Sequence, residues 1–155
     1  MFEGGIAAGQ RHTSMTDPLE GTPYRGIRRL GRGATGDVWL AEQRALQKRV
    51  AVKILSGVTN EAVVDRFRLE AQALARIAHP NVIEVTDMSR TPAGSPYLVM
   101  DLLEGRTLAE ELKTRGYFSL EEARQVMLQM LAGLTALHEQ GLLHRDIKPS
   151  NVFYC

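Results

Sequence analysis

The sequence predicts an α+β fold, in which a five-stranded antiparallel sheet carries one helix and is followed by the beginning of a helical region. Short runs of β-branched and aromatic residues fill most of the first two thirds. One helical pattern interrupts these runs, and two capping boxes, at Thr107 and Ser119, mark helix starts later in the chain. No run approaches the roughly 18 to 20 apolar residues that a membrane span needs, so no membrane segment is expected.

Composition excludes several classes of protein. The 155 residues are 44% hydrophobic and 24% charged, which is typical of a globular domain. The sequence has nineteen Lys and Arg residues and eighteen Asp and Glu residues, which gives a net charge of +1, so a nucleic-acid partner is not expected. The single cysteine, Cys155, excludes a disulfide framework and a cysteine metal site. A reducing, cytoplasmic location fits best.

The first half of the chain divides into a lead-in and three strands. Residues 1–23 are rich in Gly, Thr, Ser, Asp and Pro, which predicts a flexible segment. A domain is expected over residues 24–155. Its first strands are predicted at 24–30, 37–43 and 49–55, as an antiparallel meander.

A helix and two further strands are expected next. The helix has Thr59 or Asn60 as its N-cap and ends at residues 79–81, His-Pro-Asn. Its apolar face is formed by Val63, Phe67, Leu74 and Ile77. Strands are then predicted at 82–88 and 97–102, separated by a turn-rich segment.

The last third is predicted to be helical. Thr107 with Glu110 and Ser119 with Glu122 form the two capping boxes. Gly141 can supply the left-handed residue that ends the second helix. That helix is expected to be deeply buried through its apolar face, formed by Leu120, Ala123, Met127, Met130, Leu131, Leu134 and Leu137.

A glycine cluster lies between the first two predicted strands. Residues 31–38 read G-x-G-x-x-G-x-V, with glycines at 31, 33 and 36 and valine at 38. Glycines without side chains let backbone N–H groups approach phosphate oxygens. A plain hairpin turn is the alternative interpretation, and a Rossmann loop is disfavoured because a β-like run follows where that loop needs a helix.

Two charged residues occupy positions where apolar residues are expected. Strand alternation places Lys53 on the same face as Ala51 and Leu55, and Glu70 lies on the apolar helix face. Burying either charge alone would cost several kcal/mol, so an ion pair between Lys53 and Glu70 is the simplest interpretation. The alternative is that Lys53 extends outward and that Glu70 is solvated.

The most specific motif is H-R-D-x-K-x-x-N, at residues 144–151, between a predicted helix and a β-like run. Phosphoryl transfer to a hydroxyl needs a carboxylate to accept the proton, a cation near the phosphate and oxygen ligands for a hard metal. Asp146, Lys148 and Asn151 fit these three roles.

In this order, the glycine loop, the Val-Ala-Val-Lys strand, the helix glutamate and the His-Arg-Asp loop are similar to those of the protein kinase family, and most to bacterial serine/threonine kinases. The resemblance implies a small lobe at 24–100, a hinge at 101–105 and part of a large lobe at 106–155. It implies that Asp146 is the catalytic base, that Glu70 anchors Lys53, that Lys148 neutralises charge on the γ-phosphate and that Asn151 binds Mg²⁺. The implied ATP-contacting residues are Leu30, Gly31, Gly33, Gly36, Val38, Ala51, Lys53, Met100, Asp101, Leu103 and Phe153.

The resemblance stops before the D-F-G element, whose aspartate binds Mg²⁺ in the family. We therefore expect a serine/threonine protein kinase that uses ATP and Mg²⁺ on protein substrates, but that is weak or inactive as this chain alone. The alternative is a non-catalytic module that binds nucleotide or a protein partner. Helix faces left without their cover also predict self-association.

Overall fold

The computed structural model describes residues 17–33, 36–55, 57 and 60–154. Five antiparallel strands form the main sheet, in the order β1-β2-β3-β5-β4. The bounds are β1 Tyr24–Gly33, β2 Gly36–Gln43, β3 Lys48–Leu55, β4 Val85–Arg90 and β5 Pro96–Asp101. This order confirms the predicted sheet, although β1 continues three residues further and β4 begins three residues later than expected.

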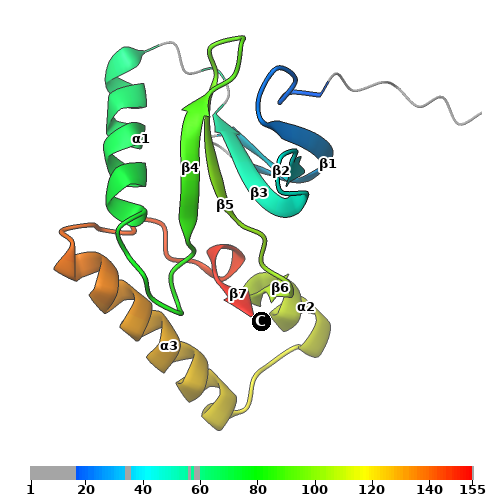
Figure 1. Ribbon diagram of the computed structural model, residues 1–155. Helices are drawn as coiled ribbons and strands as arrows, with labels where there is room; N and C mark the ends of the chain where they lie inside the picture. The colour runs from blue at the N-terminus through cyan, green and yellow to red at the C-terminus, as the bar shows by residue number, and fades with distance from the viewer. Residues whose placement is uncertain (1–16, 34–35, 56, 58–59, 155) are drawn as a thin grey trace, which may run out of the picture.

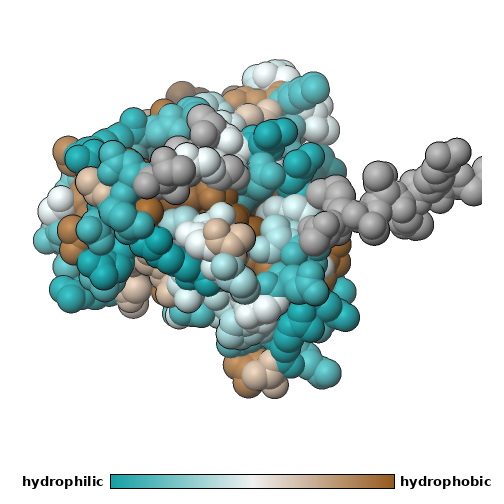
Figure 2. All heavy atoms as spheres, turned by 90° about the horizontal axis from the view of Figure 1, so that it is seen from above, coloured by the Kyte–Doolittle hydropathy of each residue, from teal (hydrophilic) through white to brown (hydrophobic). Residues whose placement is uncertain are grey.

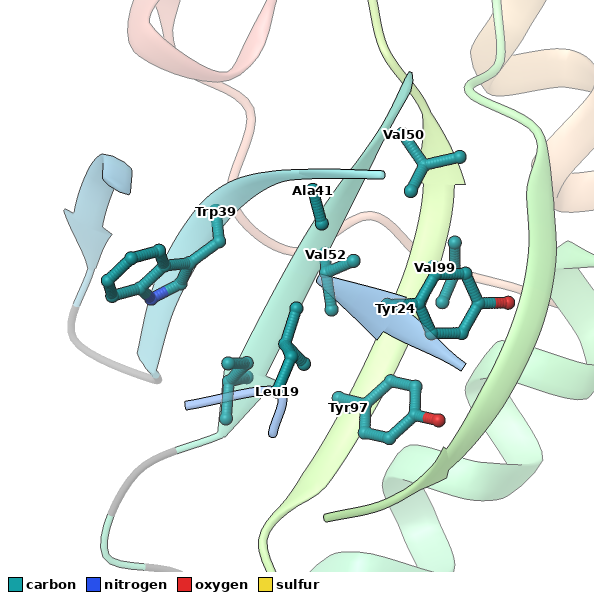
Figure 3. Packing of buried hydrophobic residues seen from close by; sticks show 9 residues of the cluster. Leu19, Tyr24, Trp39, Ala41, Val50, Val52, Tyr97 and Val99 are labelled. Atoms are coloured by element: carbon teal, nitrogen blue, oxygen red, sulfur yellow. The ribbon is translucent and has the colours of Figure 1, made fainter. Parts of the chain in front are cut away.

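The larger core lies on one face of the sheet (Figure 3). Alternate residues of β2, β3 and β5 point to this face, as the period of two in a strand requires. The cluster consists of Leu19, Tyr24, Trp39, Ala41, Val50, Val52, Ile54, Tyr97 and Val99. Tyr24 packs edge-on against Tyr97 with ring centroids 5.9 Å apart, and its hydroxyl donates to Asp87 at 2.7 Å. Burial of that polar group is thereby compensated.

The turn before β1 belongs to this core. Leu19 is fully buried, and the Asp17 carboxylate accepts hydrogen bonds from the backbone N–H groups of Leu19 and Gly26. Residues 17–23 were predicted to be flexible, and for this part of the segment the prediction is wrong. A large apolar side chain buried in the sheet core outweighs the local turn-forming composition. The remainder of the predicted segment lies outside the described residues.

Helix α1, Glu61–Leu74, packs on the β4–β5 side of the sheet (Figure 1). Asn60 is its N-cap and accepts a hydrogen bond from the Ala62 N–H, whereas Thr59 lies outside the described residues. The second core cluster joins helix and sheet and contains Ala71, Val85 and Leu98, with Phe67, Leu74, Met88 and Met100 packed against them. The helix ends five residues before His79, earlier than predicted.

The rest of the chain is mainly helical. Helix α2, Leu108–Arg115, and helix α3, Leu120–Glu139, both begin with the predicted capping boxes. Gly141 has the left-handed φ of 71° that was predicted for the end of α3. A small sheet of β6, Arg106–Thr107, and β7, Phe153–Tyr154, lies beside α2, and a 3₁₀ turn at Pro149–Asn151 precedes β7 (Figure 1).

Helix α3 is not deeply buried, so that prediction is wrong. Only Gly133 and Leu137 are buried in it, whereas Leu120 is 88% exposed and Met127 and Leu131 are about half exposed. The described residues contain nothing that covers this apolar stripe. The face of the molecule seen from above is by contrast largely hydrophilic, with smaller apolar areas between charged residues (Figure 2). Within the described ranges, no helix is both long and apolar enough to cross a bilayer.

Candidate active site

One face of the sheet gathers the residues that were predicted to contact a nucleotide. In the register of β2, β3 and β5, Lys53 lies opposite Val38 on one side and Leu98 on the other. Ala51 lies opposite Leu40 and Met100 in the same way. Residues directly opposite in antiparallel strands share a face, so Val38, Ala51, Lys53 and Met100 lie together on the side away from the larger core.

The glycine loop is a hairpin between β1 and β2, closed by the pair Gly33–Gly36. Gly36 has a φ of 143°, and a Cβ there would overlap the Ile54 carbonyl oxygen, so only glycine fits. By contrast, a Cβ at Gly31 would meet nothing within 4 Å. Ala34 and Thr35 at the tip lie outside the described residues.

Asp37, an acidic residue that follows the glycine loop, forms ion pairs with two arginines of the neighbouring strand. Asp37 pairs with Arg29 at 3.5 Å and with Arg32 at 3.7 Å. Both arginines are largely exposed, so these pairs contribute little to stability. Their effect is to place two cations next to the loop that was predicted to cover phosphates.

The predicted ion pair between Lys53 and Glu70 is not formed in this structure. Lys53 is half-buried on its strand, and Glu70 is exposed on α1. Among the described residues, neither takes part in a side-chain ion pair. The arrangement matches the alternative for Glu70, a glutamate on a solvated face.

The position of α1 explains the missing pair. Val64 and Ala71 are the buried residues of the helix, whereas Val63, predicted for the core face, is 48% exposed. Successive residues turn by about 100° around a helix, so a contact face centred on Val64 and Ala71 directs Glu70 away from it. The small Ala71 side chain also fits closely against Val85 and Leu98. A solvated carboxylate avoids the desolvation cost that a buried pair must offset.

The end of β5 is the predicted hinge. Met100 is half-buried beside the α1 cluster, and Asp101 pairs with Lys48 at 3.0 Å. The Asp101 N–H donates to the Glu84 carbonyl at 3.1 Å, so this donor is already used within the chain. Leu103, two residues further, is half-buried and follows the strand. Leu30, next to the β1 bulge, is 40% exposed.

The loop after α3 brings three predicted catalytic side chains together. The Lys148 ammonium lies 2.8 Å from Asp146 Oδ2. The Asn151 side-chain Nδ2 donates to the same oxygen and to the Asp146 carbonyl, both at 2.9 Å. The 3₁₀ turn at Pro149–Asn151 makes this possible, because it folds residue 151 back over residue 146.

These contacts set the electrostatics of Asp146. Hydrogen bonds from Lys148 and then from Asn151 lower the pKa of the Asp146 carboxyl below its ordinary value. Both bonds go to Oδ2, which leaves Oδ1 for another group. Asn151 uses its Nδ2 in these bonds, so its Oδ1 remains as an oxygen ligand of the kind that Mg²⁺ prefers.

The backbone around Asp146 is sharply turned. Arg145 has a φ of 60°, a conformation that costs free energy in a residue with a side chain. The Asp146 N–H donates to the His144 carbonyl at 2.8 Å, which closes the turn. Strained backbone at a charged loop is typical of functional sites.

A model of the protein kinase domain family matches residues 24–155. The chain belongs to the protein kinase family. Kinase domains of known structure confirm the fold: the PknI kinase domain of Mycobacterium tuberculosis has a TM-score of 0.78 at 27% identity, over 91% of this chain and 59% of that one. Another structure of the PknI kinase domain has a TM-score of 0.75 at 29% identity, over 84% and 53%.

Curated kinases are also similar in sequence. Serine/threonine-protein kinase Pkn1 of Myxococcus xanthus is 39% identical over 88% of this chain and 20% of its own length. Calcium/calmodulin-dependent protein kinase type IV of Mus musculus is 37% identical over 91% and 29%. The chain thus spans less than a third of these relatives and somewhat more than half of the solved kinase domains.

The kinase fold also contains contacts that the sequence motifs did not indicate. Phe153, predicted to face adenine, lies in β7 and is 45% exposed. Its neighbour Tyr154 packs on Phe118, with ring centroids 5.6 Å apart, and Arg115 lies over the Phe118 ring. The aromatic residues on both sides of α3 were the only signal of this packing in the sequence.

Proposed function

We propose that this chain provides the ATP-binding lobe and catalytic loop of a serine/threonine protein kinase, which transfers the γ-phosphoryl group of ATP to Ser or Thr hydroxyls of proteins. Two features support this. Val38, Ala51, Lys53 and Met100 share one face of the sheet. Asp146, Lys148 and Asn151 meet in a turn of the loop after α3. The lysine two residues after Asp146 and the kinases named above favour serine and threonine as acceptors.

Each side chain has a task in this proposal. Asp146 stays ionised because its pKa is lowered, so its free Oδ1 can orient a substrate hydroxyl and accept its proton. Lys148 is 52% exposed, and can turn from Asp146 to a phosphate oxygen. Lys53 would hold the α- and β-phosphates and Asn151 Oδ1 would be one ligand of Mg²⁺. The metal neutralises charge on the phosphates.

The observation that carries the proposal is the Asp146–Lys148–Asn151 cluster. The side chains of Lys148 and Asn151 both contact one oxygen of the Asp146 carboxylate, which a polar surface loop without a function does not require. Nucleotide binding is tested by thermal unfolding of the 155-residue chain with ATP and Mg²⁺. ATP at about 100 times its Kd stabilises by about 2.7 kcal/mol, a rise of several degrees for this size. We expect this rise in the parent chain and in Lys113→Ala, which removes an exposed lysine of α2, but not in Lys53→Ala.

Phosphate transfer by the same proteins distinguishes a kinase from the alternative, a non-catalytic module that binds nucleotide. A non-catalytic nucleotide-binding module raises its unfolding midpoint with ATP but transfers no phosphate to a Ser/Thr peptide. A kinase transfers phosphate, and Asp146→Asn abolishes the transfer. No ATP-dependent rise in the parent chain contradicts both functions. The missing Lys53–Glu70 pair favours a low rate for this chain alone, since the lysine is not held in place.

Protein contacts are part of the proposal. The stripe of exposed apolar residues along α3 fits further protein, either more of a kinase large lobe or a second copy of the chain. Self-association is tested by sedimentation velocity over a concentration series, with Leu131→Glu as the control. We expect a sedimentation coefficient that rises with concentration in the parent chain and not in the variant. A constant value in both would contradict self-association.

A further inference from the structure

Arg115 connects the end of α2 to the start of α3. It is the last residue of α2, and Gly116 follows with a φ of 83° that ends the helix. Its guanidinium pairs with Glu111 at 3.9 Å and, across the loop, with Glu122. It also lies over the Phe118 ring, with 4.8 Å between Cζ and the ring centroid.

The Glu122 carboxylate both pairs with Arg115 and takes part in the capping box at the start of α3. Its Oε2 accepts from the Ser119 N–H at 2.8 Å, while Oε1 faces Arg115. The arginine first, and the Ser119 N–H next, lower the pKa of Glu122 to about 2. The carboxylate is therefore charged at every physiological pH, so its attraction to Arg115 does not depend on pH in that range.

The same arginine is connected through the Phe118 ring to the segment that follows the catalytic loop. Phe118, under the guanidinium, packs on Tyr154 of β7. Tyr154 is also paired with Arg106 in the small sheet.

The opposite end of α2 holds the same segment. The N–H of Leu108, the first residue of α2, donates to the Val152 carbonyl at 2.7 Å. Both ends of α2 are thus connected to residues 152–154, through Leu108 at one end and through Arg115 and Phe118 at the other. Helix α2 also contacts the 3₁₀ turn that precedes these residues. Asn151, whose side chain donates a hydrogen bond to Asp146, is the residue immediately before residues 152–154.

We propose that Arg115 is a positioning residue: with α2 as a clamp on residues 152–154, it fixes Asn151 and through it the Asp146 carboxylate. The function of this clamp rests on the proposed kinase activity. Stability alone does not explain the arrangement, because exposed ion pairs contribute little to it. Arg115 instead joins α2 to the start of α3, and the Phe118 ring under its guanidinium packs on Tyr154, in the segment next to the site.

The test is NMR of the complete 155-residue chain without nucleotide, so its outcome does not depend on ATP binding. Arg115→Met removes the charge and keeps the length of the side chain. Arg124→Met is the matched control, because Arg124 pairs with Glu121 within α3. Two NMR signals are followed at one constant neutral pH: the Asn151 side-chain NH₂ and the side-chain carboxyl carbon of Asp146.

We expect Arg115→Met to remove the hydrogen-bonded shift of the Asn151 NH₂ signals and to move the Asp146 carboxyl carbon signal, because the hydrogen bond between the two side chains is lost. Arg124→Met leaves both unchanged. Unchanged Asn151 and Asp146 signals in a folded Arg115→Met chain would overturn the inference, even if the unfolding midpoint falls. Should that variant not fold, Phe118→Leu removes the ring that lies between Arg115 and Tyr154, and the same two readouts decide. An absence of ATP binding in the parent chain contradicts the proposed kinase function alone.

Discussion

At the scale of single residues, the proposed chemistry depends on which groups bind each of the two carboxylate oxygens of Asp146. Lys148 and Asn151 both bind Oδ2, so the carboxylate is oriented and keeps Oδ1 free. Hydrogen bonds to the ionised form favour it, which explains the lowered pKa of Asp146. A carboxylate held in this way is charged throughout the neutral range. If Asp146 is the base of the proposed kinase, loss of activity on acidification near neutral pH has to come from another group.

Gly133 is a second residue with a specific requirement. It is buried in the middle of α3, where glycine normally costs about 1 kcal/mol relative to alanine. A Cβ at this position would lie 2.8 Å from the carbonyl oxygen of Asn81, in the loop between α1 and β4. The glycine therefore lets the helix approach the small lobe closely.

Gly133→Ala is expected to destabilise the chain despite the better helix propensity of alanine, because overpacking costs roughly 1 to 3 kcal/mol. The measurement is the urea midpoint followed by circular dichroism. Gln129→Ala, an exposed change in the same helix, is the control and is expected to leave the midpoint unchanged or slightly higher. A higher midpoint for Gly133→Ala would show that α3 does not pack against this loop in solution.

At the scale of elements, the sequence predicted each strand and helix of the main fold, because period and capping act locally. Asn60, Thr107 and Ser119 cap helices where side-chain chemistry indicates. The errors concern contacts between elements. The rotation of α1 about its axis depends on how Ala71 fits the sheet, and a one-residue shift of the buried face from Val63 to Val64 decides whether Glu70 faces Lys53.

The same limit applies to the site. The motif singled out Asp146, Lys148 and Asn151, and the structure brings all three together within one short loop, while their catalytic roles stay predictions. Alternation correctly placed Lys53 on the same strand face as Ala51, whereas its pairing with Val38 is a matter of register that only the structure shows. The clamp through Arg115 and Tyr154 could not be predicted, because it depends on a two-residue strand and on the path of the chain between two helices.

At the scale of the whole molecule, the two parts of the chain differ in how well they are packed. In the small lobe, the larger of the two hydrophobic clusters lies on one face of the sheet and includes the buried side chains of Leu19 and Trp39. The helical part buries little: Leu137 is buried in α3, whereas Leu120, Met127, Leu128 and Leu131 of the same helix, and Leu143 and Ile147 after it, are exposed. Solved kinase domains that match this chain are longer than it, since the match covers 53% to 59% of their length.

The central claim is that the sheet face and the Asp146 loop, which lie far apart in the sequence, form one site for a nucleotide and its metal. The most direct measurement is NMR line broadening of the chain with ADP when Mn²⁺ replaces Mg²⁺, because broadening by Mn²⁺ decreases steeply with distance. We expect the strongest broadening at Asn151 and at Lys53, and its loss at both positions in Asn151→Ala. Broadening that is strongest elsewhere, or equal with and without ADP, would contradict the claim.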